Sequence, residues 1–215
     1  MDDDDVAQGA LGDCYFLSAL SVVATEEGCC AGLIDDSLDA AGCYGVTLFH
    51  KGKWNMVWVD GYFPCVVSND PHSTRAPPKP LYAASSNRRE IWPMVVEKAF
   101  AKLHGSWEAI GRGGHIGDAL KALTGGHGRT VDTSTSLAVL WPELLRQIED
   151  PGVLVGAGTK PGLDSEMAKG IVDGHAYSLL HAMQVPMGGG DVVRLVLLRN
   201  PWGHGEWVRT RVRGM

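Results

Sequence analysis

Residues 8–24 read QGALGDCYFLSALSVVA, and this stretch changes abruptly from turn-forming residues to an apolar run. Phe16, Leu20 and Val23 recur at the spacing of one helical face, so the sequence predicts a buried helix that begins close to Cys14. A helix N-terminus presents unpaired N–H groups and the positive end of its dipole, and both favour a thiolate. Cys14 is therefore a candidate nucleophile, although a cysteine judged alone is more often a small buried hydrophobe.

Gln8 lies in the same stretch, ahead of the predicted helix. Its side-chain N–H could be directed to a point beside the backbone N–H of Cys14. Two donors aimed at one point form an oxyanion hole, which stabilises the charge that develops during acyl transfer. Gln8 is therefore a candidate oxyanion donor.

A histidine stands at the start of an apolar run in the second half of the chain. His175 follows Gly174, and the run 176–180 comes directly after it. A glycine at this place allows another segment to approach closely. The position makes His175 a candidate base among the eight histidines of the chain, and a satisfied core histidine is the plainer alternative.

The apolar run 192–198 leads to Asn200, and Pro201 then stops the strand. An Asn side-chain carbonyl can accept a hydrogen bond from Nδ1–H of a histidine, which would leave Nε2 directed at the sulfur. Trp202 could shield that bond from water. In the order Cys, His, Asn, the three candidates match the Cys–His–Asn variant of the catalytic triad, whereas Asn-Pro alone is an ordinary turn.

The first half of the chain is predicted to be rich in helices. A second helix is expected over 92–103, with Gly105 as its stop. A hairpin is expected from 45–49 to 54–59, with Gly52 and Lys53 as its turn, and 68–90 is predicted to be a long surface loop. A glycine-rich zone at 111–126 separates this half from the second, and its first part, 111–115, is interpreted as a flexible connection.

The second half is predicted to be rich in strands. A helix is expected over 142–148, and strands over 153–155, 176–180 and 192–198. The sequence thus predicts an α/β (α+β) fold in two units, a helix-rich unit over 1–123 that carries the nucleophile and a β-rich unit over 124–215 that carries His and Asn.

Composition and charge exclude several classes of function. The formal net charge is −6 and no basic stripe is present, so nucleic acid is not an expected partner. Five cysteines without a CxxC pair favour neither a zinc site nor a disulfide framework, and they indicate a reducing, intracellular (cytoplasmic) setting. No apolar run reaches the roughly 18 residues that a membrane span needs, and no signal peptide is recognised.

The runs QGALGDC, GHAYS and RNPWG resemble the three active-site blocks of the calpain family, within the papain-like superfamily of cysteine proteases. The runs EIWPMVVEKAFAKLHGSWEAI, TGG and VLVGAG are similar to the family's central helix, the start of its second subdomain and its cleft-wall strand. The resemblance covers essentially all of the chain after residue 5. It implies a papain-like fold of two lobes and a calcium-dependent cysteine endopeptidase that acts on protein or peptide substrates.

Carried over by position, the resemblance implies a role for each candidate. Cys14 would be the nucleophile, His175 the base, Asn200 the third member, Gln8 the oxyanion donor and Trp202 the active-site aromatic. Tyr15 stands after the nucleophile, where calpains usually have Trp. The aromatic character is kept, so little loss is expected.

The resemblance also implies calcium sites that bring the two lobes together. Asp5 and Glu90 stand at acidic ligand positions of the first site, and carboxylate oxygens are ligands that calcium prefers. Asp5 is otherwise part of a solvated acidic tail over 2–5. Glu206 matches one ligand of the second site, but the residues after Trp207 lack the expected acidic ligands.

Two other functions remain open on this reading of the sequence. One is a non-catalytic calpain-like interaction or calcium-sensing module, which would have no chemical need for Cys14, His175 and Asn200 together. The other is transglutaminase-like acyl transfer, which normally uses Asp where this chain has Asn200. The regulatory domains or subunits of larger calpains have no counterpart within these 215 residues.

Overall fold

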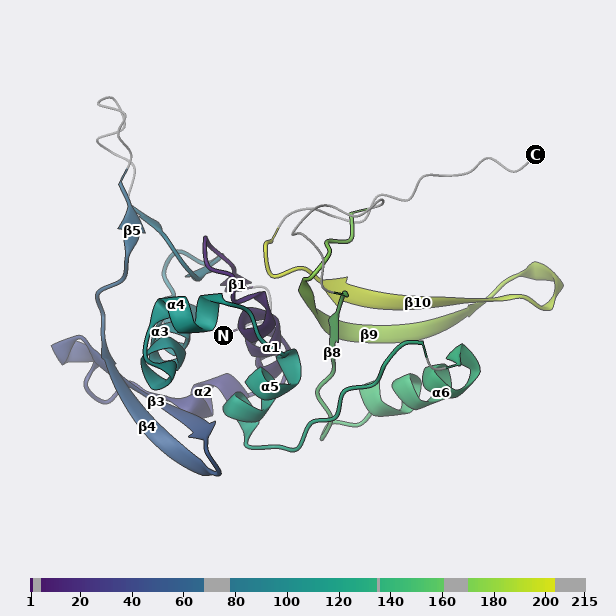
Figure 1. The fold of residues 1–215 in the computed structure, drawn as a ribbon, viewed down its shortest axis with the longest axis horizontal. Coiled ribbons are helices and arrows are strands. Elements are labelled where there is room, and N and C mark those ends of the chain that lie inside the picture. Colours follow the sequence, from purple (N-terminus) through teal and green to yellow (C-terminus); the bar gives the residue numbers. More distant parts are fainter. Residues whose placement is uncertain (2–4, 68–77, 135, 161–169, 204–215) are drawn as a thin grey trace.

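A computed structural model describes residues 1, 5–67, 78–134, 136–160 and 170–203 of the chain (Figure 1). Helices and sheets are mixed in it, as the predicted α+β class requires. Helices α1, α3 and α5 gather beside the hairpin β3–β4, and the strands β8, β9 and β10 lie with helix α6 on the other side of α1 (Figure 1).

Helix α1 (Cys14–Ala24) is at the centre of the core. Every residue from Tyr15 to Val23 is buried, so the helix is enclosed on all sides by other elements. It packs against α5, α3, β1 and β9. The ring of Phe16 stacks on that of Phe100 in α3, with the centroids 3.9 Å apart. The predicted helix and its start at Cys14 are confirmed.

The predicted hairpin is confirmed as β3 (Cys43–His50) and β4 (Lys53–Asp60), with β2 (Ile34–Asp35) on the other edge of β3. Its turn consists of Lys51 and Gly52, not Gly52 and Lys53. Both turn residues have positive φ (51° and 81°), the backbone that a two-residue hairpin turn requires. The short helix α2 (Cys29–Leu33) and the 3-10 turn η2 (Asp39–Ala41) precede the hairpin.

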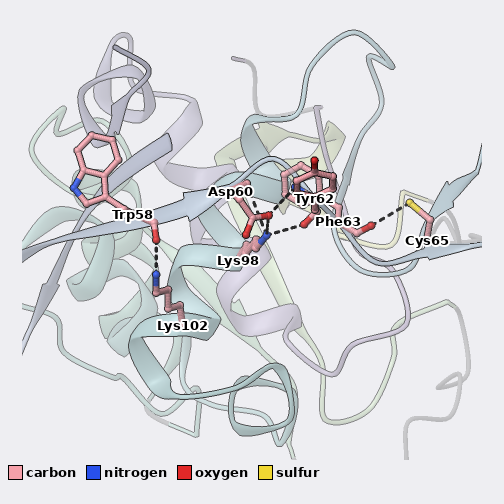
Figure 2. Close-up of polar contacts among 7 residues, drawn as sticks. All are labelled: Trp58, Asp60, Tyr62, Phe63, Cys65, Lys98 and Lys102. Carbon is pink, nitrogen blue, oxygen red and sulfur yellow. Dashed lines mark hydrogen bonds and ion pairs between the residues drawn. The ribbon is translucent and has the colours of Figure 1, made fainter. Parts of the chain in front are cut away.

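Helix α3 (Trp92–His104) confirms the second predicted helix, and Gly105 follows it with φ 102°. Two lysines of α3 fix the helix to the end of β4 (Figure 2). Lys98 Nζ donates to Asp60 Oδ1 (2.6 Å) and to the carbonyl of Tyr62 (2.7 Å), and Lys102 Nζ donates to the carbonyl of Trp58 (2.6 Å). The position of α3 relative to the hairpin is therefore set by charge-assisted hydrogen bonds.

The long surface loop predicted over 68–90 is wrong in part. Short strands β6 (Lys79–Pro80) and β7 (Ala84–Ser85) pair with β5 (Cys65–Val66) and β1 (Val6–Ala7) respectively. Residues 68–77 lie outside the described part of the chain. Two-residue strands carry no recognisable alternation, so a sequence pattern cannot reveal them.

The glycine-rich zone at 111–126 includes a helix, and residues 112–115 of the connection predicted over 111–115 lie between α4 and α5. Helix α4 (Trp107–Gly111) ends there, and helix α5 (Ile116–Thr124) buries Ala119, Ala122 and Leu123 against the core. These three residues follow helical spacing, but the glycines on both sides obscured it. Gly125, with φ 70°, ends the helix.

The second half contains α6 (Leu137–Ile148), which begins before the predicted start at residue 142 and includes Pro142. The strands β8 (Gly156–Gly158), β9 (Ala176–Pro186) and β10 (Val192–Arg199) form an antiparallel sheet in the order β10–β9–β8. The second and third predicted strands are confirmed, whereas the first, at 153–155, lies just before β8. The 3-10 turn η3 (Gly188–Gly190) joins β9 to β10.

Two further findings concern membrane spans and disulfides in the described residues. No helix among them is both long enough and apolar enough to cross a bilayer. All five cysteines lie in this part of the chain, and none of them forms a disulfide.

Candidate active site

Cys14 is the first residue of α1 and is half-buried. Asp13 occupies the N-cap position, but its side chain makes no capping hydrogen bond to the helix. The N–H groups of the first turn therefore keep their positive potential close to the thiol, which favours the thiolate.

His175 and Asn200 are joined by a hydrogen bond of 2.8 Å between Nε2 and Oδ1. The backbone N–H of Trp202 also donates to Asn200 Oδ1, at 3.0 Å, so this oxygen is an acceptor and Nε2 carries the proton. The prediction that Nδ1 would face Asn200 is wrong. Asn200 follows the neighbouring strand β10, and Nε2, the ring nitrogen farther from the histidine's own backbone, is the one that reaches it.

Aromatic rings surround the imidazole, and His175 is only 3% exposed. The ring of Trp202 lies 4.6 Å from it, centroid to centroid, and the ring of Tyr177 lies 4.9 Å away in a nearly perpendicular orientation. Trp202 thus covers the imidazole and is positioned to keep water from the His175–Asn200 hydrogen bond. Exclusion of water strengthens this bond, because a hydrogen bond is stronger in an apolar setting.

Thr159, which no local sequence pattern indicated, holds the backbone of His175. Its hydroxyl accepts the His175 N–H (2.8 Å) and donates to the carbonyl of Val172 (2.7 Å), while its own N–H donates to the carbonyl of His175 (2.9 Å). Gly174 precedes the histidine with φ 62°, a conformation that favours glycine. The entry into β9 is therefore fixed on both sides of His175.

A pair of buried serines fastens α1 to β9. Ser18 Oγ donates to the carbonyl of Ala176 (2.9 Å), and Ser178 Oγ donates to the carbonyl of Ser18 (2.9 Å). Ser18 lies one turn after Cys14, and Ala176 follows His175. The two hydrogen bonds therefore bring the helix of Cys14 and the strand that follows His175 into one region. Burial raises the pKa of Tyr177, and the charge of Cys14 raises it further, so the thiol shares this environment.

Gln8 lies between the two halves of the site. Its backbone N–H donates to the carbonyl of Pro201 (2.7 Å), and its side-chain Nε2 donates to the carbonyl of Leu11 (2.6 Å). The Leu11 carbonyl orients the amide so that nitrogen, not oxygen, faces the loop before Cys14. The second N–H of the same nitrogen is the donor that an oxyanion role requires.

Asp5 and Glu90 are brought to one loop. Ser86 bonds to Asp5 through its N–H (2.9 Å, to the carbonyl) and its hydroxyl (3.5 Å, to Oδ1). The next residue, Asn87, donates to Glu90 Oε1 (2.9 Å), and Trp92 Nε1 donates to Glu90 Oε2 (3.1 Å). Asp5 and Glu90 thus contact neighbouring residues of the 86–90 loop, and carboxylate oxygens are ligands that calcium prefers.

The described residues contain no larger group of metal-binding side chains. No cluster of three or more His, Cys, Asp or Glu side chains able to hold a metal occurs among them. Glu206, the candidate for a second calcium site, lies outside the described residues, as do Asp2, Asp3 and Asp4.

Comparison with known proteins defines the class of this site. The family model described as "Calpain family cysteine protease" matches residues 1–210, so the protein is of the cysteine protease class. The calpain-type cysteine protease DEK1 of Arabidopsis thaliana is 41% identical over 212 residues, which cover 94% of this chain and 9% of that relative. Calpain-12 of Homo sapiens and the calpain-1 catalytic subunit of Rattus norvegicus are each 32% identical over 94% of this chain and 27% and 28% of their own lengths.

The chain belongs to the calpain family. It spans about a tenth to less than a third of the length of these relatives.

Proposed function

We propose that this chain is the catalytic core of a cysteine endopeptidase that hydrolyses peptide bonds through a thioester acyl-enzyme. The hydrogen bond between His175 Nε2 and Asn200 Oδ1 carries the proposal, because it orients an imidazole on a strand that is fastened to the helix of Cys14. An orienting group of this kind is the third member of a Cys–His–Asn triad.

In the proposed mechanism Nδ1 of His175 exchanges the proton with the sulfur, since Nε2 is held by Asn200. The Cys14 thiolate attacks the peptide carbonyl, while the Cys14 N–H and Gln8 Nε2 stabilise the oxyanion. The imidazolium then protonates the leaving amine, and the C–N bond breaks to give the thioester. His175 next takes a proton from water, which attacks the thioester and releases the acyl group as a carboxylic acid.

The wider setting is part of the same proposal. The substrates are proteins or peptides, and the cysteines without disulfides support a reducing, intracellular compartment. The division into two catalytic lobes at residues 123 and 124 falls in the last turn of α5 and stays a prediction.

Replacement of Cys14 tests the assignment of the nucleophile. Cys14→Ala should abolish cleavage of a casein-like substrate while far-UV circular dichroism and the unfolding midpoint stay unchanged, because only the sulfur is lost. Cys65→Ala is the matched control, since Cys65 is exposed and should be dispensable. Cleavage by Cys14→Ala at the wild-type rate would refute the proposal.

We further propose that calcium regulates the enzyme through Asp5 and Glu90. The ion, when bound, would hold the segment before Gln8 against the 86–90 loop. Terbium, a luminescent substitute for calcium, should show emission sensitised by Trp92, whose indole contacts Glu90. Asp5→Asn and Glu90→Gln should lose this emission, and the exposed Glu108→Gln should keep it. Equal terbium emission in all four proteins would exclude this site.

Thiol labelling distinguishes the enzyme from a non-catalytic calcium-sensing module. An active-site alkylator should modify Cys14 selectively and faster with calcium than with a chelator. Labelling of Cys14 no faster than that of the exposed Cys29 would favour the non-catalytic alternative.

A further inference from the structure

Two carboxyl groups that the proposed mechanism does not use meet in the core beside the nucleophile. Asp13 directly precedes Cys14 and is 0% exposed, and Glu97, in the middle of α3, is 1% exposed. The salt bridges of the described residues include neither of them. A buried carboxylate without a cation is costly, so this pair calls for a physical explanation.

Each carboxyl acts on the pKa of the other through a side-chain hydrogen bond, and such a bond between two carboxyls needs a proton between them. Both oxygens of Asp13 are buried, and Glu97 is the one side chain among the described residues that lowers its pKa through a hydrogen bond, which makes the Glu97 carboxyl the side-chain donor. Burial, and then the charge of Asp13, raise the pKa of Glu97 to about 10. Burial raises that of Asp13 to about 6, although the bond from Glu97 opposes the rise. At neutral pH the pair therefore holds one proton.

The titratable neighbours of the pair do not supply a counter-charge. Tyr15 faces Asp13 from the first turn of α1, and burial raises its pKa to about 12, so it is a neutral phenol at neutral pH. Cys14 and Asp118 also act on the pKa of Tyr15, and neither of them is a cation. The shared proton is thus what makes burial of the pair tolerable.

Glu97 also holds the segment 81–83, against which the loop of Gln8 lies. Its two oxygens accept the N–H of Ala83 at 3.0 and 3.1 Å. The two residues before Ala83 contact that loop, since Leu81 accepts the N–H of Ala10 (2.9 Å) and a Cβ at Gly9 would lie 2.2 Å from the carbonyl of Tyr82. One side chain therefore contacts both the residue before the nucleophile and the support of the oxyanion loop.

We propose that Asp13 and Glu97, joined by one shared proton, are positioning residues that fix the Cys14 thiol relative to the Gln8 loop. The inference rests on the proposed function, because it assigns these groups to the same site. It predicts that the hydrogen bond, rather than the volume of the Glu97 side chain, maintains the reactivity of the nucleophile.

Two variants of similar size separate the hydrogen bond from packing. Glu97→Gln keeps a donor for Asp13 and an acceptor for Ala83 N–H, whereas Glu97→Met keeps neither. The rate of Cys14 alkylation by iodoacetamide, followed by mass spectrometry across pH, should be close to wild type in Glu97→Gln and about tenfold or more lower in Glu97→Met at neutral pH. The exposed Glu108→Met should react like wild type.

The pH profile gives a readout that packing alone would not move. The wild-type alkylation rate should decline near pH 10, where the pair loses its last proton and the two charges repel, and Glu97→Gln should show no such decline. Equal rates for Glu97→Met and wild type, or a Glu97→Gln that is as slow as Glu97→Met, would overturn the proposal.

Two further outcomes of the alkylation experiment remain informative. If Glu97→Met does not fold, an alkaline decline that persists in Glu97→Gln would overturn the proposal, and its disappearance would support it. Alkylation does not depend on peptide cleavage, so a wild-type chain that reacts selectively at Cys14 but cleaves no peptide would refute the proposed function alone.

Discussion

Asn200 Oδ1 accepts two hydrogen bonds, one from the ring of His175 and one from the backbone of Trp202. Because both bonds end on the same oxygen, the amide cannot turn over without losing both of them. The side chain therefore selects the imidazole tautomer with the proton on Nε2, and it leaves Nδ1 available for the proton exchange with sulfur that the proposed mechanism requires.

Removal of this side chain should affect catalysis more than stability. In Asn200→Ala the imidazole loses its orienting acceptor, so kcat/KM for a peptide substrate should fall by about 10²-fold, within the range for general acid–base catalysis. Steady-state kinetics with the substrate at several concentrations would measure the change. Asn55→Ala, which removes an amide at the β3–β4 turn, is the matched control. Unchanged kinetics in Asn200→Ala would contradict the orienting role.

At the scale of elements, the reciprocal bonds of Ser18 and Ser178 connect a helix and a strand that are far apart in sequence. Both serines are 0% exposed. Ser178→Ala removes the donor to the Ser18 carbonyl, so the free energy of unfolding should fall by about 1 kcal/mol, and Cys14 alkylation should slow as α1 loosens from β9. Urea unfolding followed by tryptophan fluorescence measures the first effect.

The control for this experiment is Ser37→Ala, because Ser37 is exposed and its hydrogen bonds to Asp35 stay within a local turn. A Ser178→Ala protein as stable and as reactive as this control would show that the serine bonds contribute nothing to the joint between α1 and β9.

The elements that sequence patterns predicted well are the long ones. Helices α1 and α3 and the strands β3, β4, β9 and β10 have enough residues for their periodicity to be evident. Helix α5 has nine residues between glycine clusters, and its burial depends on α1, so no local pattern revealed it. Predictions for short elements failed because their partners, and not their own residues, determine them.

The candidate site divides in the same way. The types and order of Cys14, His175 and Asn200 are apparent in the sequence, but the nitrogen that faces Asn200 depends on the packing of β9 beside β10. Thr159 and Glu97 act through contacts with residues distant in sequence. Only a three-dimensional structure shows such contacts.

At the scale of the whole molecule, the Asp13–Glu97 pair gives stability a dependence on pH. The pKa of Glu97 rises from its ordinary value of 4.5 to about 10 in the folded chain, and that of Asp13 rises from 3.8 to about 6. The folded state thus binds protons that the unfolded state releases. Their contribution is greatest in acid, and the part due to Glu97 is lost steadily as the pH rises toward 10.

The free energy of unfolding should therefore decline between about pH 6 and about pH 9, with Glu97 contributing at most about 1.4 kcal/mol for each pH unit. Glu97→Gln has no proton to lose and should show a flatter dependence over this range. Urea titrations at several pH values would measure both slopes. Parallel slopes for the two proteins would mean that Glu97 ionises normally in the folded chain.

The bond from the Gln8 N–H to the Pro201 carbonyl joins two parts of the site through the main chain alone. Most side-chain replacements leave such a bond intact, so alanine scanning of this segment would overlook it. Gly9 is different, because an added methyl group would lie 2.2 Å from the Tyr82 carbonyl oxygen and 2.5 Å from that of Leu81. The close approach of residues 81 and 82 thus leaves no room for a side chain at position 9. A library that diversifies the first ten residues should therefore keep glycine there.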